Sequence, residues 1–286
     1  MPIIQTEDLT YTYGPNTPFQ RTALHSVSLS IEEGAFLGVI GHTGSGKSTF
    51  IQHLNGLLKP ASGRVYIDGV DLASSKEAAL NARFQVGLLF QYPEYQLFDE
   101  TVSQDIAFGP RNMGLSEAEV EARVHDAAGF VGLEEALLSK SPFELSGGEK
   151  RRAAIAGVMA MRPRVLILDE PTAGLDPRGQ EQILDNILTY KRETGATVIM
   201  VTHSMEEIAR LADTIAVFKS GQIVMEGTPA DIFAQGDALR DLGLAVPAVT
   251  RIAMRLAELG RPIGPCYTVE QAVSAIMTLE RGRPDA

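Results

Sequence analysis

The residues with the clearest chemical potential form a short glycine-rich segment. It reads Gly41-His42-Thr43-Gly44-Ser45-Gly46-Lys47-Ser48-Thr49 and stands between an apolar run, 36–40, and a helix-compatible run, 50–58. Glycines at this spacing let successive backbone N–H groups converge on phosphates at a helix N-terminus, where the helix dipole adds positive potential. Lys47 would neutralise phosphate charge, and the Ser48 hydroxyl would bind magnesium. The segment therefore predicts a phosphate-binding loop between a strand and a helix; the alternative is a glycine-rich turn that contains Lys and Ser by chance.

A second chemical feature is the apolar run 165–168, which ends in Asp169 and Glu170. A fully apolar strand that ends in acids places them at the carboxyl edge of a parallel sheet, where open α/β folds bind ligands. Asp169 is suited to hold magnesium through water, and Glu170 to polarise an attacking water as a general base. Alone, this pair would be an ordinary solvated strand end. Together with the phosphate loop, it predicts nucleotide hydrolysis.

A third feature is a possible second anion cradle. Ser146, Gly147, Gly148 and Glu149 open a helical run, and serine followed by two glycines at a helix N-terminus exposes backbone donors. Helical segments between 92 and 145 separate this cradle from the phosphate loop. The arrangement is explained if the cradle covers a nucleotide that another subunit holds.

The elements that must position these motifs alternate between strand and helix patterns. Strand patterns occur at 3–31, broken by a loop at 14–18, and at 63–67, 86–90, 165–168 and 197–201, with a hairpin at 215–225. Helices are expected behind Ser116-x-x-Glu119, from Asp176 to Lys191, and behind Ser204. This order predicts an α/β domain with a helical insertion.

The last 46 residues or so leave this alternation. Apolar residues at helical spacing predict two amphipathic helices, at 249–259 and 269–279, separated by 260–265. Thr268 and Gln271 form a capping pattern before the second. Their apolar faces would pack either on the main domain or on another subunit.

Composition and charge narrow the class of protein. The chain has 286 residues, 44% of them hydrophobic, and 36 Asp plus Glu against 25 Lys plus Arg, which gives a net charge of −11. This acidity argues against a nucleic-acid partner, because the protein has no strong positive field that would attract nucleic-acid phosphates without specificity. No apolar run is long enough to span a membrane, no signal peptide is expected, and the single cysteine, Cys266, is expected to be a passive thiol.

Over residues 3 to about 235, the chain resembles the nucleotide-binding subunits of ATP-binding-cassette (ABC) transporters. The resemblance implies an α/β ABC fold: a P-loop core sheet, an antiparallel β subdomain and a helical subdomain, here with a small C-terminal helical appendage. Together with the change of pattern near residue 240, it predicts an ABC ATPase domain at 1–240, with the helical subdomain at about 92–160, and a C-terminal helical dimerisation or appendage region at 241–286. The resemblance also implies ATP and Mg²⁺ as cofactors. It identifies Leu145–Glu149 as the signature motif, 173–176 as the inter-subunit loop, and Gln91 as the residue that contacts magnesium and links the nucleotide to the membrane partner. It further implies that His203 contacts the γ-phosphate and that Tyr13 stacks on adenine. The expected nucleotide contacts are Tyr13, Gly41, Gly44, Ser45, Gly46, Lys47, Ser48, Thr49, Gln91, Asp169 and, toward a partner's nucleotide, Ser146, Gly147, Gly148 and Glu149; Glu170 and His203 are catalytic, and Ser48, Gln91 and Asp169 serve the metal. Glu149 departs from the family's usual glutamine and is expected to modulate function.

In finer detail the chain is similar to the ATPases of energy-coupling-factor (ECF) transporters. The segments that carry this resemblance are 41–49, 90–98, 101–102, 106–109 and 151–157, and the run 93–98 looks most like the second of the two ATPase subunits. The family implies a peripheral ATPase on the cytoplasmic face of the membrane that drives uptake of vitamins or transition-metal ions. Its partners would be a second homologous ATPase subunit in a heterodimer, with a homodimer also possible, a transmembrane coupling protein and substrate-binding membrane proteins.

Two alternatives remain open at the sequence level. One is a conventional ABC importer or exporter subunit; the other is a non-transport ABC ATPase acting on nucleic acid or ribosomes, which the acidic charge and the single phosphate loop disfavour. Motion would pass to the membrane through the region after Gln91. There we expect Glu94, or else Asp99 or Glu100, to pair with arginines of the coupling protein, unless this is simply a solvated acidic loop.

Overall fold

The computed structural model describes residues 2–281, and packing divides them into two compact units. Unit 1 contains residues 2–35 and 48–201, and unit 2 contains residues 36–47 and 202–281. The chain passes from one unit to the other inside the glycine-rich loop, between Lys47 and Ser48. Each unit has its own strands and its own buried residues.

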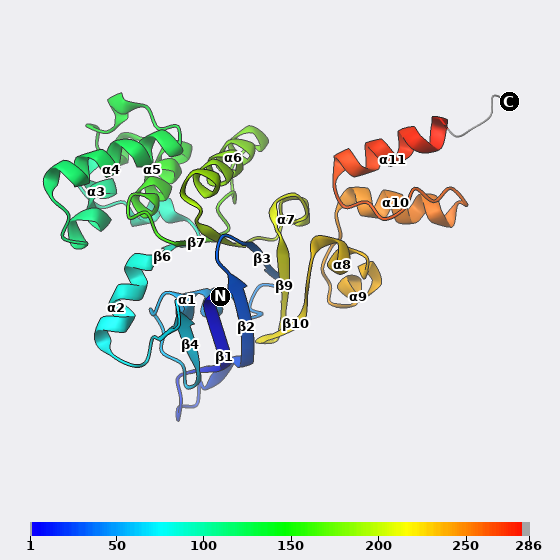
Figure 1. Cartoon of the computed structure of the whole chain (residues 1–286), viewed down its shortest axis with the longest axis horizontal. Coiled ribbons are helices and arrows are strands. Elements are labelled where there is room, and N and C mark those ends of the chain that lie inside the picture. The colour runs from blue at the N-terminus through cyan, green and yellow to red at the C-terminus, as the bar shows by residue number, and fades with distance from the viewer. Residues whose placement is uncertain (1, 282–286) are drawn as a thin grey trace. The chain divides into compact units, whose positions relative to one another are not determined.

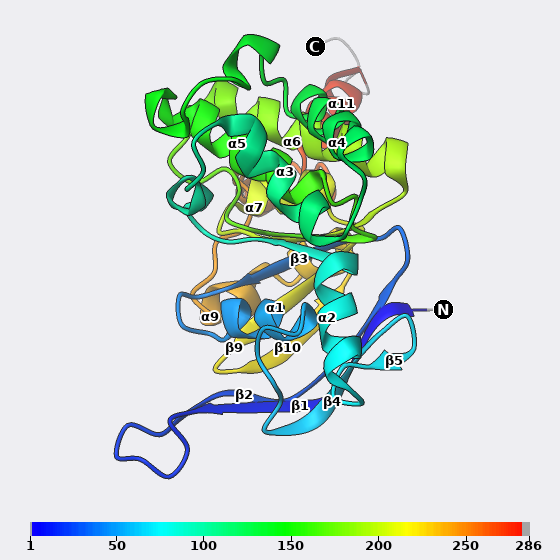
Figure 2. The ribbon, with the colours of Figure 1, turned by 90° about the vertical axis from the view of Figure 1, so that its left-hand side faces the viewer.

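Unit 1 contains an antiparallel sheet with the order β2-β1-β4-β5. Its strands, visible in Figure 2, are β1 (Pro2–Tyr13), β2 (Arg21–Glu32), β4 (Ser62–Ile67) and β5 (Val70–Asp71). Val27, Leu29 and Ile31 alternate with exposed residues along β2, as expected for a strand with one buried face. The two predicted strands at 3–31 and the strand at 63–67 are therefore confirmed.

A second group of strands in unit 1 is parallel and fully buried. It comprises β6 (Val86–Leu89), β7 (Val165–Asp169) and β8 (Thr197–Val201), with β7 in the middle. Parallel strands covered on both faces are nearly continuous apolar runs, which explains why the sequence shows them so clearly. The register pairs Leu89 with Leu168 and Asp169 with Val201, so the residues that follow all three strands meet at one carboxyl edge.

The helices of unit 1 begin with α1 (Lys47–Leu54) and α2 (Lys76–Gln85), the latter not predicted from the sequence. The helical insertion consists of α3 (Val102–Asn112), α4 (Glu117–Phe130) and α5 (Gly147–Met159), which pack on one another (Figure 1), with short 3-10 turns at Pro93–Gln96, Glu135–Leu137 and Pro142–Glu144. Ser116 and Glu119 form the predicted capping box of α4. Helix α6 (Pro177–Thr194) is capped by Asp176 and ends at Gly195, whose φ of 72° suits a glycine C-cap.

Unit 2 contains β3 (Phe36–Gly41), β9 (Thr214–Lys219) and β10 (Gln222–Gly227) in that order. Strand β3 pairs in parallel with β9, which forms the predicted hairpin with β10. Helix α7 (Met205–Leu211) packs closely on β3. Gly38 allows this approach, since a Cβ there would lie 2.8 Å from the side chain of Ile208. Two short helices follow, α8 (Pro229–Phe233) and α9 (Gly236–Asp241).

The chain continues in unit 2 with the two predicted amphipathic helices, α10 (Ala248–Glu258) and α11 (Val269–Arg281), which lie side by side (Figure 1). Ala253, Cys266 and Ala272 form their shared core. Part of the remaining apolar surface is exposed, including Ile252, Leu259, Val269 and Val273. The boundary near residue 240 stays a prediction, and residues 282–286 of the expected appendage lie outside the described residues.

Among residues 2–281, no helix combines the length and the apolar character needed to cross a membrane. The described fold is thus mixed α/β, with an antiparallel sheet and a helical subdomain, as the sequence predicts.

Candidate nucleotide site

The glycine-rich loop in unit 2 curls tightly at the end of β3. Gly41, Gly44 and Gly46 all have positive φ, and a Cβ at Gly41 would collide with the Phe218 carbonyl and the Ser45 hydroxyl. The Ser45 amide donates to the His42 carbonyl at 3.1 Å, which closes the turn. Glycine is therefore needed at the first position for close approach to β9 and at the other two for backbone conformation.

Lys47 lies against the carbonyls of this loop. Its side chain is nearly buried, and its ammonium donates to the carbonyls of Gly41, at 2.6 Å, and His42, at 2.9 Å. These carbonyls hold the cation at the loop that the sequence assigns to phosphate binding. A phosphate would offer this ammonium a charge-assisted hydrogen bond.

In unit 1, the next residue of the chain reaches the acidic end of β7. The Ser48 hydroxyl donates to Oδ2 of Asp169 at 3.0 Å. The Thr49 hydroxyl in turn lies 3.1 Å from the phenol oxygen of Tyr13, a residue that is 42% exposed. The sequence-predicted residues Tyr13, Ser48, Thr49 and Asp169 are thus brought together, although they come from three distant segments.

Two other predicted residues of unit 1 follow the ends of buried strands. Gln91 follows β6, and Glu170 follows β7, so both lie at the carboxyl edge that carries Asp169. Glu170 has φ of 52°, and its amide donates to the Val201 carbonyl at 2.8 Å. A non-glycine residue in the left-handed region costs about 1–2 kcal/mol and is common at functional sites. Tyr92, directly after Gln91, has φ of 56°.

His203 belongs to unit 2, between the end of β8 and the start of α7. The amide of the preceding Thr202 approaches the Val39 carbonyl of β3 at 3.4 Å. This contact places the segment of His203 beside the strand that leads into the phosphate loop.

The signature segment starts α5 with a complete capping box. The Ser146 amide and hydroxyl donate to Oε2 of Glu149, at 2.8 and 2.6 Å, and the Glu149 amide approaches the Ser146 hydroxyl at 3.4 Å. The hydroxyl of Ser146 lowers the pKa of Glu149. The departure from the family's glutamine therefore preserves the reciprocal cap and places a carboxylate charge at the cradle.

The expected contact of Glu94 with a membrane partner is not supported by its surroundings. Its carboxylate is held inside the chain by Arg151 of α5, through hydrogen bonds from Nη2 at 2.9 and 3.1 Å and from Nε at 3.2 Å. The Arg151 side chain is 3% exposed and also donates to the carbonyls of Pro171 and Ala173. Arg151 therefore connects the segment after Gln91, the signature helix and the loop after Glu170.

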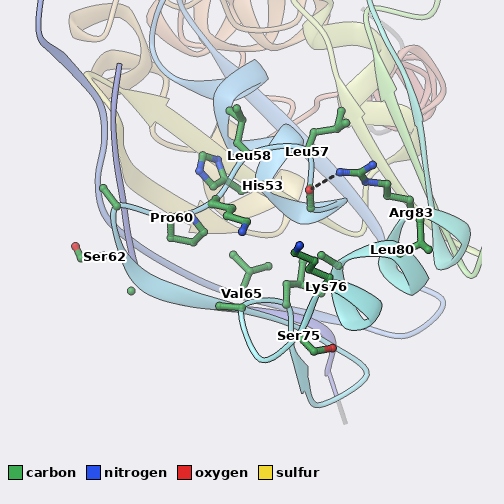
Figure 3. A pocket seen from close by; sticks show the side chains of 17 residues that line it. His53, Leu57, Leu58, Pro60, Ser62, Val65, Ser75, Lys76, Leu80 and Arg83 are labelled. Carbon is green, nitrogen blue, oxygen red and sulfur yellow. Dashed lines mark hydrogen bonds between the residues drawn. The ribbon is translucent and has the colours of Figure 1, made fainter. Parts of the chain in front are cut away.

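A separate cavity of about 770 Å³ in unit 1 lies between α1, β4 and α2 (Figure 3). None of the residues that the sequence assigns to the nucleotide lines it; the lining includes His53, Leu57, Val65, Leu80 and Arg83. His53 is fully buried, its Nδ1 lies 2.7 Å from the Thr49 carbonyl, and burial lowers its pKa. His53 therefore packs in the core at the end of α1.

The oxygen donors that meet in unit 1 suit magnesium. Ser48 and Asp169 offer a hydroxyl and one carboxylate, and Mg²⁺ is commonly held by one or two such protein ligands together with phosphates and water. Among the described residues, no group of three or more His, Cys, Asp or Glu side chains could hold a metal alone. The residues therefore fit a metal that arrives with a nucleotide.

The fold and these contacts define a phosphate-loop nucleotide-binding protein, and comparisons with known proteins specify the family. The model of the protein family described as "ABC transporter" matches residues 24–173. Two relatives named energy-coupling factor transporter ATP-binding protein EcfA2 are each 52% identical. The one from Caldanaerobacter subterraneus aligns over 98% of both chains, and the one from Clostridium perfringens over 97% of this chain and 98% of the relative.

Solved structures agree with these sequence relatives. CbiO1 of Clostridium perfringens, described as part of the ABC transporter complex CbiONQ, is 37% identical, covers 91% of this chain and 97% of its own, and has a TM-score of 0.74. A dimeric ATP-binding cassette in a post-hydrolysis state with ADP and Pi is 29% identical, covers 79% of this chain and 98% of its own, and has a TM-score of 0.72. The chain belongs to the ABC transporter family and, within it, to the ATP-binding proteins of energy-coupling factor transporters. The family, fold and ATPase class predicted from the sequence are thereby confirmed.

Sequence reasoning missed two residues of this region. In the sequence, Arg151 belongs to the segment 151–157 and His42 to the glycine-rich loop, and neither was assigned a role of its own. In the structure, Arg151 binds Glu94, and the imidazole of His42 bonds the Leu242 carbonyl. Both depend on partners from segments far away along the chain. The only sequence signals were their places within the signature helix and the phosphate loop.

Proposed function

We propose that this chain binds and hydrolyses ATP as one ATPase subunit of an energy-coupling factor importer, on the cytoplasmic face of the membrane. The observation that carries the proposal is the 3.0 Å hydrogen bond from Ser48 of the phosphate loop segment to Asp169 at the end of β7. These two residue types, in these two motifs, are the pair that holds the magnesium ion of a bound nucleotide in phosphate-loop proteins. The family relationship supports the same activity.

The residues of the chain divide the chemistry among them. Backbone donors of 41–47 and the Lys47 ammonium would bind the phosphates, with Tyr13 stacking on adenine. Ser48, Asp169 and Gln91 would hold Mg²⁺, which neutralises phosphate charge when bound. Glu170 would orient and deprotonate the attacking water, and His203 would contact the γ-phosphate.

The signature cradle of Ser146, Gly147, Gly148 and Glu149 would cover a nucleotide held by a second ATPase subunit. The N-terminus of α5 projects backbone donors at this point, and a Cβ at Gly147 would have no neighbour within 4 Å. This surface is therefore open to a partner's phosphates. ATP binding would close the dimer, and hydrolysis would release it.

The contact with the membrane partner would use aromatic side chains rather than Glu94. The segment after Gln91 exposes Tyr92, Tyr95 and Phe98, and Phe108 of α3 stacks edge-on against Phe98 at 5.1 Å. Exposed apolar side chains gathered in one place mark protein contact sites. They would receive cytoplasmic segments of the transmembrane coupling protein, which in turn serves substrate-binding membrane proteins for vitamins or transition-metal ions.

The test of this function replaces Glu170 by Gln, which keeps the shape and removes the base. In the complete membrane complex, we expect ATP binding and dimer closure to persist while turnover falls at least about tenfold. Unchanged hydrolysis at both nucleotide sites would refute the role of Glu170. Purification with a coupling protein and small substrate-binding membrane proteins supports the ECF class, whereas a pair of permease subunits would indicate a conventional ABC transporter.

A further inference from the structure

The side chain of His42, the second residue of the glycine-rich loop, contacts the C-terminal part of unit 2. Its imidazole Nε2 hydrogen-bonds the carbonyl of Leu242, the residue that follows α9. The carbonyls at the end of a helix lack partners within that helix, so this one is available to a donor. The bond joins the second residue of the phosphate loop to a residue 200 positions later.

The turn that presents this carbonyl is shaped to receive the imidazole. The Gly243 amide donates to the Arg240 carbonyl at 2.7 Å, and the Leu244 amide to the Leu239 carbonyl at 2.8 Å. Gly243 has φ of 67°, and a Cβ there would lie 2.7 Å from Nε2 of His42. Glycine therefore permits both the turn and the approach of the ring, while the buried side chains of Leu239 and Leu244 anchor the turn.

The same segment makes a second contact near another predicted site residue. At the start of α10, the Ala248 amide donates to Oε1 of Glu206 at 3.1 Å. Glu206 lies in the first turn of α7, three residues after His203. Leu242 and Ala248, the ends of the segment 242–248, thus contact the phosphate loop and helix α7, which begins two residues after His203.

The link reaches the group that would meet the phosphates. The backbone carbonyl of His42 accepts a hydrogen bond from the Lys47 ammonium at 2.9 Å, while its imidazole holds Leu242. Phosphates bound by the backbone N–H groups of the loop and by Lys47 would order the backbone at His42. The imidazole would transmit that ordering to the Leu242 turn.

We propose that His42 is a positioning residue that couples nucleotide binding at the phosphate loop to the ordering of the C-terminal segment 242–248. This inference rests on the proposed function. By linkage, the coupling is reciprocal: nucleotide stabilises the segment at the start of α10, and a partner that fixes α10 and α11 raises the affinity for nucleotide. The C-terminal helices then report on occupancy of the site without contacting the ligand.

The test measures nucleotide affinity and amide hydrogen exchange on the full chain with Mg²⁺ and an ATP analogue whose β–γ bridge cannot be hydrolysed. In the unaltered protein, the analogue should slow exchange in 242–248. His42→Ala should weaken binding about 2- to 10-fold, the value of one hydrogen bond, and abolish that slowing. His42→Gln, whose amide can still donate, should restore part of both effects.

The matched control is His25→Ala, because His25 is an exposed histidine of β2 in unit 1; it should behave as the unaltered protein. The inference is wrong if the unaltered protein binds the analogue without any change at 242–248, or if His42→Ala retains both affinity and protection. Absence of analogue binding by the unaltered protein would instead overturn the proposed function. The two failures are therefore distinguishable.

Discussion

Replacing Arg151 by Met should expose how strongly the internal ion pair stabilises unit 1. The guanidinium is 3% exposed, its Glu94 partner is 19% exposed, and Arg151 also donates to the carbonyls of Pro171 and Ala173. Removing one member of a buried pair costs about 3–5 kcal/mol, because the other charge stays buried without compensation. Since Glu94 keeps some access to water, we expect the lower end, about 3 kcal/mol.

Thermal unfolding measures this loss. For a chain of this size, about 3 kcal/mol corresponds to a fall in Tm of roughly 6 °C. The matched control is Arg111→Met, which removes an exposed ion pair with Glu117 and should change stability by about 0–1 kcal/mol. Adding Glu94→Leu to Arg151→Met should recover part of the loss, because a buried pair is often replaceable by apolar residues.

Two results would refute this reasoning. One is an Arg151→Met variant that unfolds at the temperature of the Arg111→Met control. The other is strict additivity between Arg151→Met and Glu94→Leu, since residues in direct contact should show a coupling free energy. Either result would mean that the bidentate geometry contributes no net stability.

Two further predictions concern the nucleotide site. Ser48→Ala removes the hydroxyl that bonds Asp169. The Mg²⁺ concentration for half-maximal ATPase activity should therefore rise about tenfold, while binding of metal-free nucleotide changes little. An unchanged Mg²⁺ requirement in a titration would exclude Ser48 as a ligand. Glu149→Gln keeps an acceptor for Ser146 and removes a carboxylate that would repel the phosphates of a partner's nucleotide, so ATP-driven dimer association should tighten about threefold, the value of one exposed charge pair. The pKa of Glu149 is lowered, so the contribution of its carboxylate to the cap is present above the ordinary value of 4.5 and is lost as pH falls through the lowered pKa. The carboxylate is therefore charged at neutral pH, where the tighter association of Glu149→Gln should be seen. Equal dimer affinities of the two proteins at neutral pH, measured by sedimentation, would contradict this prediction.

The sequence identified the elements whose patterns are local. The apolar runs of β6, β7 and β8 and the capping residues Ser116 and Asp176 appear in the structure where their patterns indicate. Helix α2 escaped prediction because only Ala82 of its residues is buried, so it carries no apolar stripe. A helix that packs through so little surface gives no periodic signal.

The contacts of individual polar residues were less predictable than their motifs. Ser48 and Asp169 could be paired from the sequence because each belongs to a motif with a defined chemical role. Glu94 could not be paired with its partner from the sequence, because a glutamate on a polar segment shows the same local pattern whether the cation that it binds lies in α5 or in another protein. His42 presents the same difficulty, because its partner is a backbone carbonyl, which every residue possesses.

The internal engagement of Glu94 changes how the segment after Gln91 can transmit motion. Arg151 binds Glu94 and the carbonyls of Pro171 and Ala173 at the same time. If the segment after Gln91 moves, either α5 and the loop after Glu170 move with it, or hydrogen bonds to a buried cation break. Breaking them would cost several kcal/mol, so a joint movement is favoured. A membrane partner that contacts the exposed aromatic side chains would thereby move the signature helix and the segment that begins at Glu170, with Arg151 as the rigid connection.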